Sequence, residues 1–458
     1  MSLNDRHSAW AARLARRAAI VDDATAFYAA GSLRRVVGQT IEADGCVASL
    51  GAACDIIEAD GRRIETEVVG FAEDRLFLIP TSQVGQIAPS ASVVPRAAHK
   101  RQRIDERILG RVINGHGAPL DGAGPVDGDD ELAPRASVRN PLSRAPIDTP
   151  LDVGVRAINA VLTLGRGQRV GLFAGSGVGK STLLGMMTRH TAADVVVVGL
   201  IGERGREVGE FVHETLGRDG LSRAVVVATP ADETPLMRIN GAWLATRVAE
   251  YFRDRGASVL LLMDSLTRFA QAQREIGLAI GEPPTTKGYP PSVFSLLPQL
   301  IERAGNGAAG QGSITAVYTV LAEGDDPNDP IVDAARAILD GHLVLSRSVA
   351  ESGVYPALDV ERSISRAAHR LVSAEHQAKV AEFRELIAAY QQNADLIRIG
   401  AYQPGADPII DRSLQIFPRV RQFLSQGLNE AVSLAESTAA LHDMLAFQGT
   451  EILSGASQ

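Results

Sequence analysis

The chain has 458 residues, and at about 150 residues per domain that length predicts about three domains. Hydrophobic residues make up 45% of the chain and charged residues 22%, which excludes a globally disordered protein. The formal net charge of -8 argues against a general nucleic-acid binder, although a local basic patch stays open. Two cysteines, Cys46 and Cys54, are too few for a disulfide framework and lack metal-ligand spacing, which fits a reducing cytosol.

Residues 1–25 are predicted to form a basic amphipathic helix. Trp10, Leu14 and Val21 follow helical spacing, and three arginines are displaced around the axis, namely Arg6, Arg13 and Arg17. Arginines also interrupt the apolar core that a signal peptide needs, and no apolar run of the chain approaches the about 18 residues of a membrane span. Two interpretations of the segment stay open: docking to a partner or an anionic surface, and a helix packed on its own domain or frayed in solvent.

Residues 26–97 are predicted to form a small β-barrel. Short strand patterns recur there, as R-V-V-G-Q-T-I, C-D-I-I, I-E-T-E-V-V-G-F and R-L-F-L-I-P, with Asp-Gly turns at Asp44-Gly45 and Asp60-Gly61. Evenly spaced short strands are typical of a closed barrel. A Gly/Pro/Asp-rich stretch, Asn114 to Asp130, then predicts an exposed connection.

Residues 98–370 are predicted to form an α/β core, and residues 371–458 a helical domain. From Gly165 the sequence has continuous apolar runs separated by amphipathic segments: R-V-G-L-F-A, D-V-V-V-V-G-L-I, A-V-V-V-A-T, S-V-L-L-L-M-D, S-I-T-A-V-Y-T-V-L and H-L-V-L-S. Strands buried on both faces need such runs, so a mainly parallel sheet between helices follows. After about Ala367 helical periodicity takes over, as in V-A-E-F-R-E-L-I-A-A-Y and A-V-S-L-A-E-S-T-A-A-L-H-D-M-L.

The strongest functional signal is a phosphate-binding loop, A-G-S-G-V-G-K-S-T at Ala174 to Thr182, between a predicted strand and a predicted helix. Its glycines let backbone N–H groups face a phosphate, Lys180 would reach the outer phosphates, and Ser181 would bind Mg²⁺. The predicted nucleotide-binding residues of the loop are Gly175, Ser176, Gly177, Val178, Gly179, Lys180, Ser181 and Thr182.

Two carboxylates are expected at the same edge of the sheet. Asp264 ends the run S-V-L-L-L-M-D and is a candidate Walker B residue for the metal's water shell, with helix capping as the alternative. Glu203, in G-L-I-G-E-R-G-R-E-V after the second core strand, is the candidate base that polarises the attacking water. A salt-bridged helix start is the alternative for that run.

Together with these motifs, further segments carry a resemblance: A-I-G-E-P-P-T-T-K-G-Y-P-P-S-V-F, E-R-A-G-N-G, T-V-L-A-E-G-D-D, R-A-I-L-D-G-H-L-V-L-S-R and Y-P-A-L-D-V-E-R-S-I-S-R. Over nearly its whole length the chain resembles the ATPases of type III secretion systems, and most of all the flagellum-specific export ATPases. This family is similar to the catalytic subunits of rotary ATP synthases. The resemblance implies an N-terminal β-barrel, a RecA-like P-loop ATPase core and a C-terminal helical domain.

The resemblance also implies roles for matched residues in binding and hydrolysing ATP with Mg²⁺. Arg204 and Arg268 would approach the γ-phosphate, and Glu207 would support the metal's water shell together with Asp264. Tyr355 and Tyr402 would pack on the adenine, with a buried core tyrosine as the alternative for each. Arg366 would enter the site of a neighbouring subunit.

The implied protein is cytoplasmic and peripheral to the export apparatus. Its implied partners are further copies of itself in a hexameric ring, a stator-like regulator at the N-terminus, a central stalk-like protein, the export gate, and export substrates with their chaperones. Contact with acidic phospholipid is a further possibility for the N-terminal segment, and no nucleic acid is expected.

The residues also argue against three other functions. A RecA-like nucleic-acid motor needs a basic, aromatic strand face, whereas the barrel region offers Phe71 and Phe77 with mixed charge. A non-catalytic ring subunit typically lacks the carboxylate that Glu203 supplies. The loop S-G-V-G-K-S, in place of G-A-G-V-G-K-T, and the lack of a D-E-L-S-E-E-D-type segment argue against a synthase. An injectisome ATPase remains the main alternative to a flagellar one.

Overall fold

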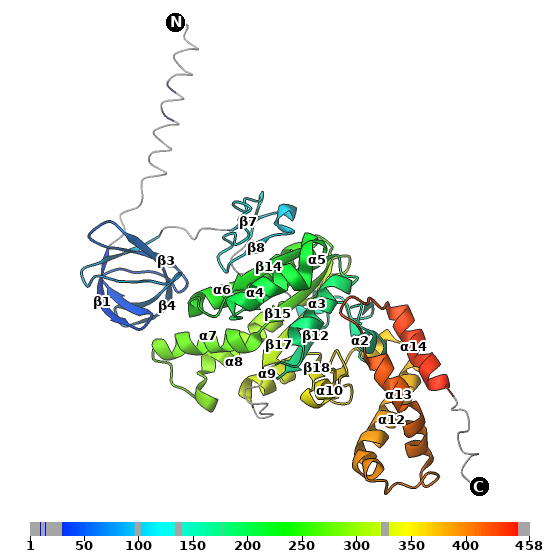
Figure 1. Cartoon of the computed structure of the whole chain (residues 1–458). Coiled ribbons are helices and arrows are strands. Elements are labelled where there is room, and N and C mark those ends of the chain that lie inside the picture. The colour runs from blue at the N-terminus through cyan, green and yellow to red at the C-terminus, as the bar shows by residue number, and fades with distance from the viewer. Residues whose placement is uncertain are drawn as a thin grey trace, which may run out of the picture. The chain divides into compact units, whose positions relative to one another are not determined.

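The computed structural model describes residues 10, 14, 30–96, 102–132, 140–175, 177–321 and 329–447 (Figure 1). They form two compact units, one with the N-terminal strands and Ile276–Glu282, the other with the large sheet and the C-terminal helices. The predicted N-terminal helix lies outside the described residues except for Trp10 and Leu14, which are exposed. In the part that the structure describes, no helix combines the length and apolar character that crossing a bilayer requires.

The first unit is a closed barrel with the strand order β1-β2-β5-β4-β3-β6, which confirms the predicted β-barrel. Its strands are β1 (Gly31–Val37), β2 (Thr40–Asp44), β3 (Ala53–Ile57), β4 (Arg63–Ala72), β5 (Arg75–Pro80) and β6 (Ser92–Pro95). Ile41, Ile56, Leu78 and Val93 fill the interior and are at most 1% exposed. Closure removes the unpaired strand edges of an open sheet.

One strand prediction in the barrel was wrong. The run R-V-V-G-Q-T-I is a hairpin, because β1 ends at Val37 and β2 begins at Thr40. Gly38 has φ +59°, a conformation that glycine adopts without steric cost, and it turns the chain between the strands. The single strand predicted for this run is therefore parts of two strands joined by a turn.

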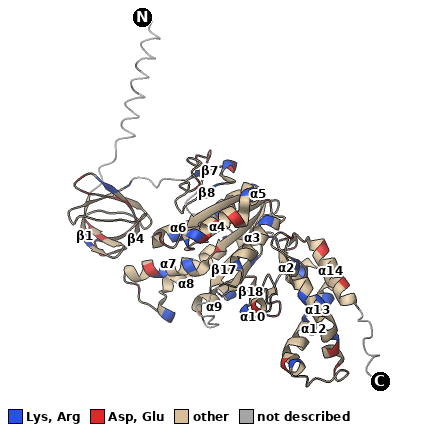
Figure 2. Cartoon of the chain, in the orientation of Figure 1, with Lys and Arg blue, Asp and Glu red and all other residues tan. Residues whose placement is uncertain are grey.

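The second unit contains a large sheet with the order β19-β18-β12-β17-β15-β13-β14-β8, with β16 paired to β17. Its strands are β8 (Val112–Ile113), β12 (Arg169–Ala174), β13 (Val195–Ile201), β14 (Ala224–Thr229), β15 (Ser258–Asp264), β16 (Gly305–Asn306), β17 (Ser313–Leu321), β18 (Gly341–Leu345) and β19 (Ile364–Ser365). Every residue of β13, β14 and β15 is buried, which confirms that the apolar runs are strands covered on both faces. Figure 2 shows most charged residues on helices and loops rather than on these strands.

Helices and short β-pairs complete this unit. The helices are α2 (Arg156–Val161), α3 (Lys180–His190), α4 (Gly205–Glu210), the π-helical η3 (Phe211–Leu216), α5 (Gly217–Ser222), α6 (Pro235–Asp254), α7 (Leu266–Ala279), α8 (Pro291–Ile301), α9 (Pro330–Ile338), α10 (Arg347–Glu351) and α11 (Ala368–Leu371), with short 3₁₀ turns η1 (Glu106–Ile108), η2 (Pro141–Ser143) and η4 (Thr286–Gly288). The β-pairs are β7 (Arg103–Ile104) with β9 (Asp130–Glu131), and β10 (Pro150–Leu151) with β11 (Leu164–Gly165). Helix α6 packs on β13, β14 and β15, while α9 packs on β12 and β17.

The last described residues, 374–447, form three helices, as their periodicity predicted: α12 (Ala374–Arg398), α13 (Pro408–Leu424) and α14 (Leu434–Ala446). Helix α14 starts three residues later than the predicted pattern, because Ser433 and Glu436 form a capping box. His376 on α12 lies 2.7 Å from the Ala160 carbonyl and 3.0 Å from His442 on α14, which ties these helices to α2. The domain boundaries given above, at residues 25, 97 and 370, stay predictions.

Candidate nucleotide-binding and catalytic site

The predicted phosphate loop lies between the carboxyl end of β12 and the first turn of α3. Gly177 and Gly179 have φ of +77° and +91°, so the backbone turns through conformations that favour glycine. Val178 between them is 2% exposed and joins the hydrophobic core, which anchors the loop. Such a loop presents N–H groups to an anion at a helix N-terminus. Ser176 lies outside the described residues.

Lys180 joins the two carboxylates that the sequence singled out. Its Nζ donates to Glu203 Oε1 at 2.9 Å and to Asp264 Oδ1 at 2.7 Å. Burial alone would lower the pKa of Lys180, but the neighbouring carboxylates of Asp264 and Glu203 outweigh it and raise this pKa. The ammonium group is therefore held in its charged form at the centre of the site.

Asp264 is the most deeply buried member of this cluster, with 3% of its surface exposed. Burial raises the pKa of Asp264, while Lys180 acts in the opposite direction. The Thr319 hydroxyl also donates to Asp264 Oδ1, at 2.6 Å, and so fixes the orientation of the carboxylate. Sequence reasoning missed Thr319. Its position near the carboxyl end of β17 was the only signal, and the strand contains another threonine, Thr315.

The strand order explains how these distant residues meet. Strands β12, β17, β15 and β13 are neighbours in that order, and their pairs are parallel. Lys180 follows β12, Thr319 lies on β17, Asp264 ends β15, and Glu203 follows β13. All four therefore lie along the carboxyl edge of the sheet, where open α/β sheets bind ligands.

Three further predicted residues follow the same strand ends. Arg204 donates to Glu207 Oε1 at 3.3 Å, and its side chain is 80% exposed. A β-carbon on Gly202 would lie 2.8 Å from Arg268 Cβ, so the stem of Arg268 packs on the main chain just before Glu203. The Arg268 guanidinium donates to Gln271 at 2.8 Å. In these contacts, neither arginine forms an ion pair with a buried carboxylate.

The donors at this edge fit Mg²⁺, which prefers oxygen ligands and keeps several of its waters. Ser181 is exposed in the first turn of α3, and the adjoining cluster of Lys180, Asp264 and Glu203 has two carboxylates against one ammonium. Positive charge from a bound cation would balance the net negative charge of this cluster. The described residues contain no group of three His, Cys, Asp or Glu side chains arranged around a metal. Ser181 and Asp264 would therefore hold the ion together with waters and nucleotide oxygens.

The two candidate adenine tyrosines lie in different surroundings. A β-carbon on Gly179 would lie 3.9 Å from Tyr355 Cδ1, so this ring borders the phosphate loop, and Tyr355 is 46% exposed. Tyr402 lies in the connection between α12 and α13, where its hydroxyl is 2.9 Å from Asp411 Oδ1 and 3.0 Å from the Asp407 carbonyl, either of which can accept its hydrogen. In the structure, Tyr402 thus contacts residues of its own helical hairpin, α12 and α13, and its contact with adenine stays a prediction.

Arg366 lies at the opposite edge of the sheet from the phosphate loop. Its neighbour Ser365 pairs with Gly341, the first residue of β18, whereas Ala174 before the loop pairs with Leu345, the last residue of β18. The two positions are separated by the length of β18, which is about 13–17 Å at ~3.3 Å per residue. Arg366 is exposed, and its guanidinium donates to the Leu339 carbonyl at 3.2 Å.

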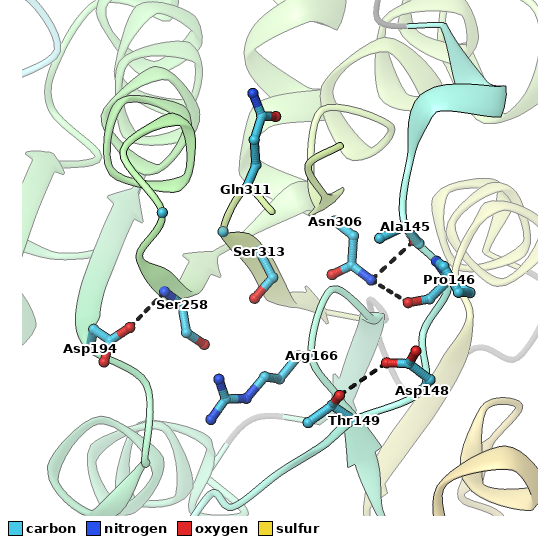
Figure 3. A pocket seen from close by; sticks show the side chains of 12 residues that line it. Ala145, Pro146, Asp148, Thr149, Arg166, Asp194, Ser258, Asn306, Gln311 and Ser313 are labelled. Carbon is cyan, nitrogen blue, oxygen red and sulfur yellow. Dashed lines mark hydrogen bonds between the residues drawn. The ribbon is translucent and has the colours of Figure 1, made fainter. Parts of the chain in front are cut away.

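A cavity of about 210 Å³ also lies at the amino ends of the strands (Figure 3). Asp194, Ser258 and Ser313, which line it, precede or begin β13, β15 and β17. Since these are the strand starts, the cavity is on the edge opposite Lys180. It is therefore not the nucleotide site.

Fold and site together define a P-loop ATPase of the ATP synthase α/β type. The model of the ATP synthase alpha/beta family, nucleotide-binding domain, matches residues 154–365, and that of the T3SS EscN ATPase C-terminal domain matches residues 372–443. The flagellum-specific ATP synthase of Pseudomonas aeruginosa is 58% identical over 91% of this chain and 93% of its own length. The type 3 secretion system ATPase of Xanthomonas euvesicatoria is 45% identical over 90% of this chain and 92% of its own length.

Among solved structures, the assembled ATPase EscN of the enteropathogenic E. coli type III secretion system has a TM-score of 0.86 at 43% identity. The match covers 91% of this chain and 100% of that one. EscN in complex with its central stalk EscO gives a TM-score of 0.83 at 42% identity. The chain belongs to the family of flagellum-specific ATP synthases and type III secretion ATPases, and it is an ATPase.

Substitutions of Lys180 and Glu203 distinguish the binding of ATP from its hydrolysis. Lys180→Ala should abolish ATP hydrolysis, because the phosphate loop then lacks the ammonium group that contacts the outer phosphates. Glu203→Gln should retain ATP binding and lose about 10²–10⁴ in kcat, because only activation of the water is removed. Binding of a fluorescent ATP analogue and steady-state phosphate release measure the two effects. As a control, Glu210→Gln removes an exposed carboxylate on α4 and should change neither. A Glu203→Gln enzyme within a few-fold of wild type would show that Glu203 is not the base.

Proposed function

We propose that this ATPase hydrolyses Mg²⁺-bound ATP to ADP and phosphate at the carboxyl edge of the core sheet, and that the hydrolysis energises protein export for flagellum assembly. The observation that carries the proposal is the contact of Lys180 with both Glu203 and Asp264. It joins a phosphate-binding cation, a candidate base and a candidate metal carboxylate in one cluster.

The residues divide the chemistry of phosphoryl transfer among them. The loop N–H groups and Lys180 bind the phosphates, while Ser181 and Asp264 would hold Mg²⁺, which would supply positive charge to the phosphate oxygens. Glu203 orients and deprotonates the attacking water. Arg204 and Arg268 approach the γ-phosphate, and Glu207 supports the metal's water shell. Tyr355 packs on one face of the adenine, and Tyr402 is the weaker candidate for the other.

Arg366 acts on a neighbouring copy of the chain. Its position on the edge opposite the phosphate loop supports a contact with the γ-phosphate of an adjacent subunit rather than with its own. Repeating this head-to-tail contact closes a ring if the rotation allows. We therefore propose a homo-hexamer with catalytic sites between subunits.

A flagellar role is favoured over an injectisome role, because the flagellum-specific relative from Pseudomonas is more similar to this chain than the Xanthomonas secretion ATPase is. The injectisome ATPase remains the second candidate, since EscN shares the fold. Deleting the gene tests the choice. Loss of filaments supports the flagellar role, and loss of contact-dependent effector secretion with intact filaments contradicts it.

The proposed partners follow from the family. A central stalk-like protein is supported by the EscN–EscO complex. A stator-like regulator would bind residues 1–25, and the export gate, substrates and chaperones would act at the cytoplasmic face of the apparatus, with acidic phospholipid as a further contact of the N-terminal segment.

Mixing two inactive variants tests the shared site. Arg366→Ala and Lys180→Ala should each be inactive alone. The first lacks the arginine finger, which is the guanidinium that enters the neighbouring site, and the second lacks the phosphate-binding cation. In mixed rings, an intact loop from the Arg366→Ala chain meets an intact finger from the Lys180→Ala chain, so ATPase activity should return. Arginine fingers contribute about 10³–10⁵ in rate, which makes partial rescue easy to detect. Absence of rescue in rings shown to be mixed would contradict a finger in trans.

Removing residues 1–21 tests the N-terminal segment. Trp10 and Leu14 are 64% and 59% exposed, so they are free to meet a partner. The truncated chain should lose co-purification with the regulator while its thermal unfolding stays unchanged. A matched double variant, Arg6→Ala with Arg13→Ala, keeps the apolar residues. Its co-purification shows whether the regulator is bound through the charges or through the apolar residues. Unchanged co-purification of the truncated chain would overturn this assignment.

A further inference from the structure

The loop that connects α13 to α14 contacts the nucleotide site from within the C-terminal helices. We call residues 425–430 the junction loop. Its central polar residue, Gln426, is 7% exposed. The Gln426 Nε2 group donates to the carbonyls of Gly154 and Glu430, each at 2.7 Å, and Oε1 accepts from the Arg156 N–H at 2.7 Å. Three hydrogen bonds thus hold this side chain in one position.

The main chain of Gln426 is the part that reaches the nucleotide site. Its N–H donates to the Tyr355 carbonyl at 2.8 Å. On the preceding helix, Arg421 donates to the Ser352 carbonyl at 2.5 Å. Helix α13 and the junction loop therefore hold the backbone from Ser352 to Tyr355 at both ends. The ring of Tyr355 in turn borders Gly179 of the phosphate loop.

The junction loop also contacts the far end of the helix that Lys180 begins. Arg189 in the last turn of α3 donates to the Leu428 carbonyl and to Asn429 Oδ1, both at 2.9 Å. From α2, Arg156 donates to the carbonyls of Phe423 and Ser425, at 3.1 and 3.0 Å, at the end of α13. The loop is thus fixed against α2, α3 and the Tyr355 segment together.

We propose that Gln426 is a positioning residue for the adenine side of the nucleotide site, which acts by holding Tyr355 against the phosphate loop. This inference rests on the proposed function, in which Tyr355 packs on adenine. With the Gln426 side chain fixed by its three hydrogen bonds, its N–H fixes the Tyr355 carbonyl and hence the ring. The helical domain thereby sets the affinity for the base, without touching the reacting phosphate.

The chemistry predicts a specific kinetic signature. The adenine contact is the same in the bound substrate and in the transition state, so loosening it raises KM and leaves kcat unchanged. Gln426→Met keeps the side-chain length while removing its hydrogen bonds. We expect about a tenfold rise in the KM for ATP, with kcat within about twofold of wild type. The inhibition constant of inorganic triphosphate, which has no base, should stay unchanged.

Matched variants separate positioning from general loosening of the helices. His376→Leu also removes a buried contact between the C-terminal helices and α2, through the Ala160 carbonyl, but it touches neither Tyr355 nor the junction loop. It should lower the thermal midpoint without raising KM. Tyr355→Ala should raise KM by itself, and adding Gln426→Met to it should raise KM no further, because both act on one contact.

The outcomes distinguish this inference from the function on which it rests. If Tyr355→Ala raises KM while Gln426→Met and Gln426→Ala, both folded, do not, the positioning role is wrong and the adenine role of Tyr355 stands. If Gln426→Met weakens triphosphate as much as ATP, the effect is general and the inference is overturned. If Tyr355→Ala leaves KM unchanged, the adenine role fails, and this inference fails with it.

Discussion

One ammonium group between two carboxylates determines the arrangement of the site. Asp264 is buried at the end of a central strand, where an unpaired charge is costly, and its pKa is raised by that burial. Lys180 offsets this cost and at the same time contacts Glu203, which follows β13, the strand adjacent to β15. In the proposed mechanism, ATP would draw the same ammonium toward its phosphates, and Mg²⁺ would supply the positive charge that Asp264 loses. The cluster therefore links the stability of the apo site to the binding of the metal–nucleotide complex.

The parallel sheet gives each subunit two chemically different edges. The carboxyl edge carries the phosphate loop, Glu203 and Asp264, whereas Arg366 lies at the amino edge, one strand length away. A molecule with a phosphate loop on one edge and Arg366 on the other is suited to head-to-tail assembly, in which, as proposed, each site is completed by the next copy. The same direction of the strands that brings Lys180, Glu203 and Asp264 together therefore separates Arg366, the proposed arginine finger, from the phosphate loop of its own chain.

Much of the fold could be predicted from the sequence, because its signals are local. Apolar runs identified the strands β12 to β15, β17 and β18, and the glycines with Lys180 identified the phosphate loop. The misread hairpin at Gly38 shows the limit of local patterns, because one glycine can turn the chain within a run that otherwise has strand character. Thr319 and Gln426 were missed, since their importance arises from strand order and from contacts across more than 50 residues of sequence. The placement of Tyr402 likewise depended on a hairpin that periodicity alone does not show.

The most direct test is a structure of this ATPase with Mg²⁺ and a non-hydrolysable ATP analogue, compared with one lacking nucleotide. We predict that Lys180 Nζ moves to within hydrogen-bonding distance of the outer phosphates and releases Glu203. Asp264 should then face the water shell of the metal, and the freed carboxylate of Glu203 should face the water next to the γ-phosphate. A bound analogue with Lys180 still on both carboxylates, at 2.9 and 2.7 Å as in the present structure, would contradict the account.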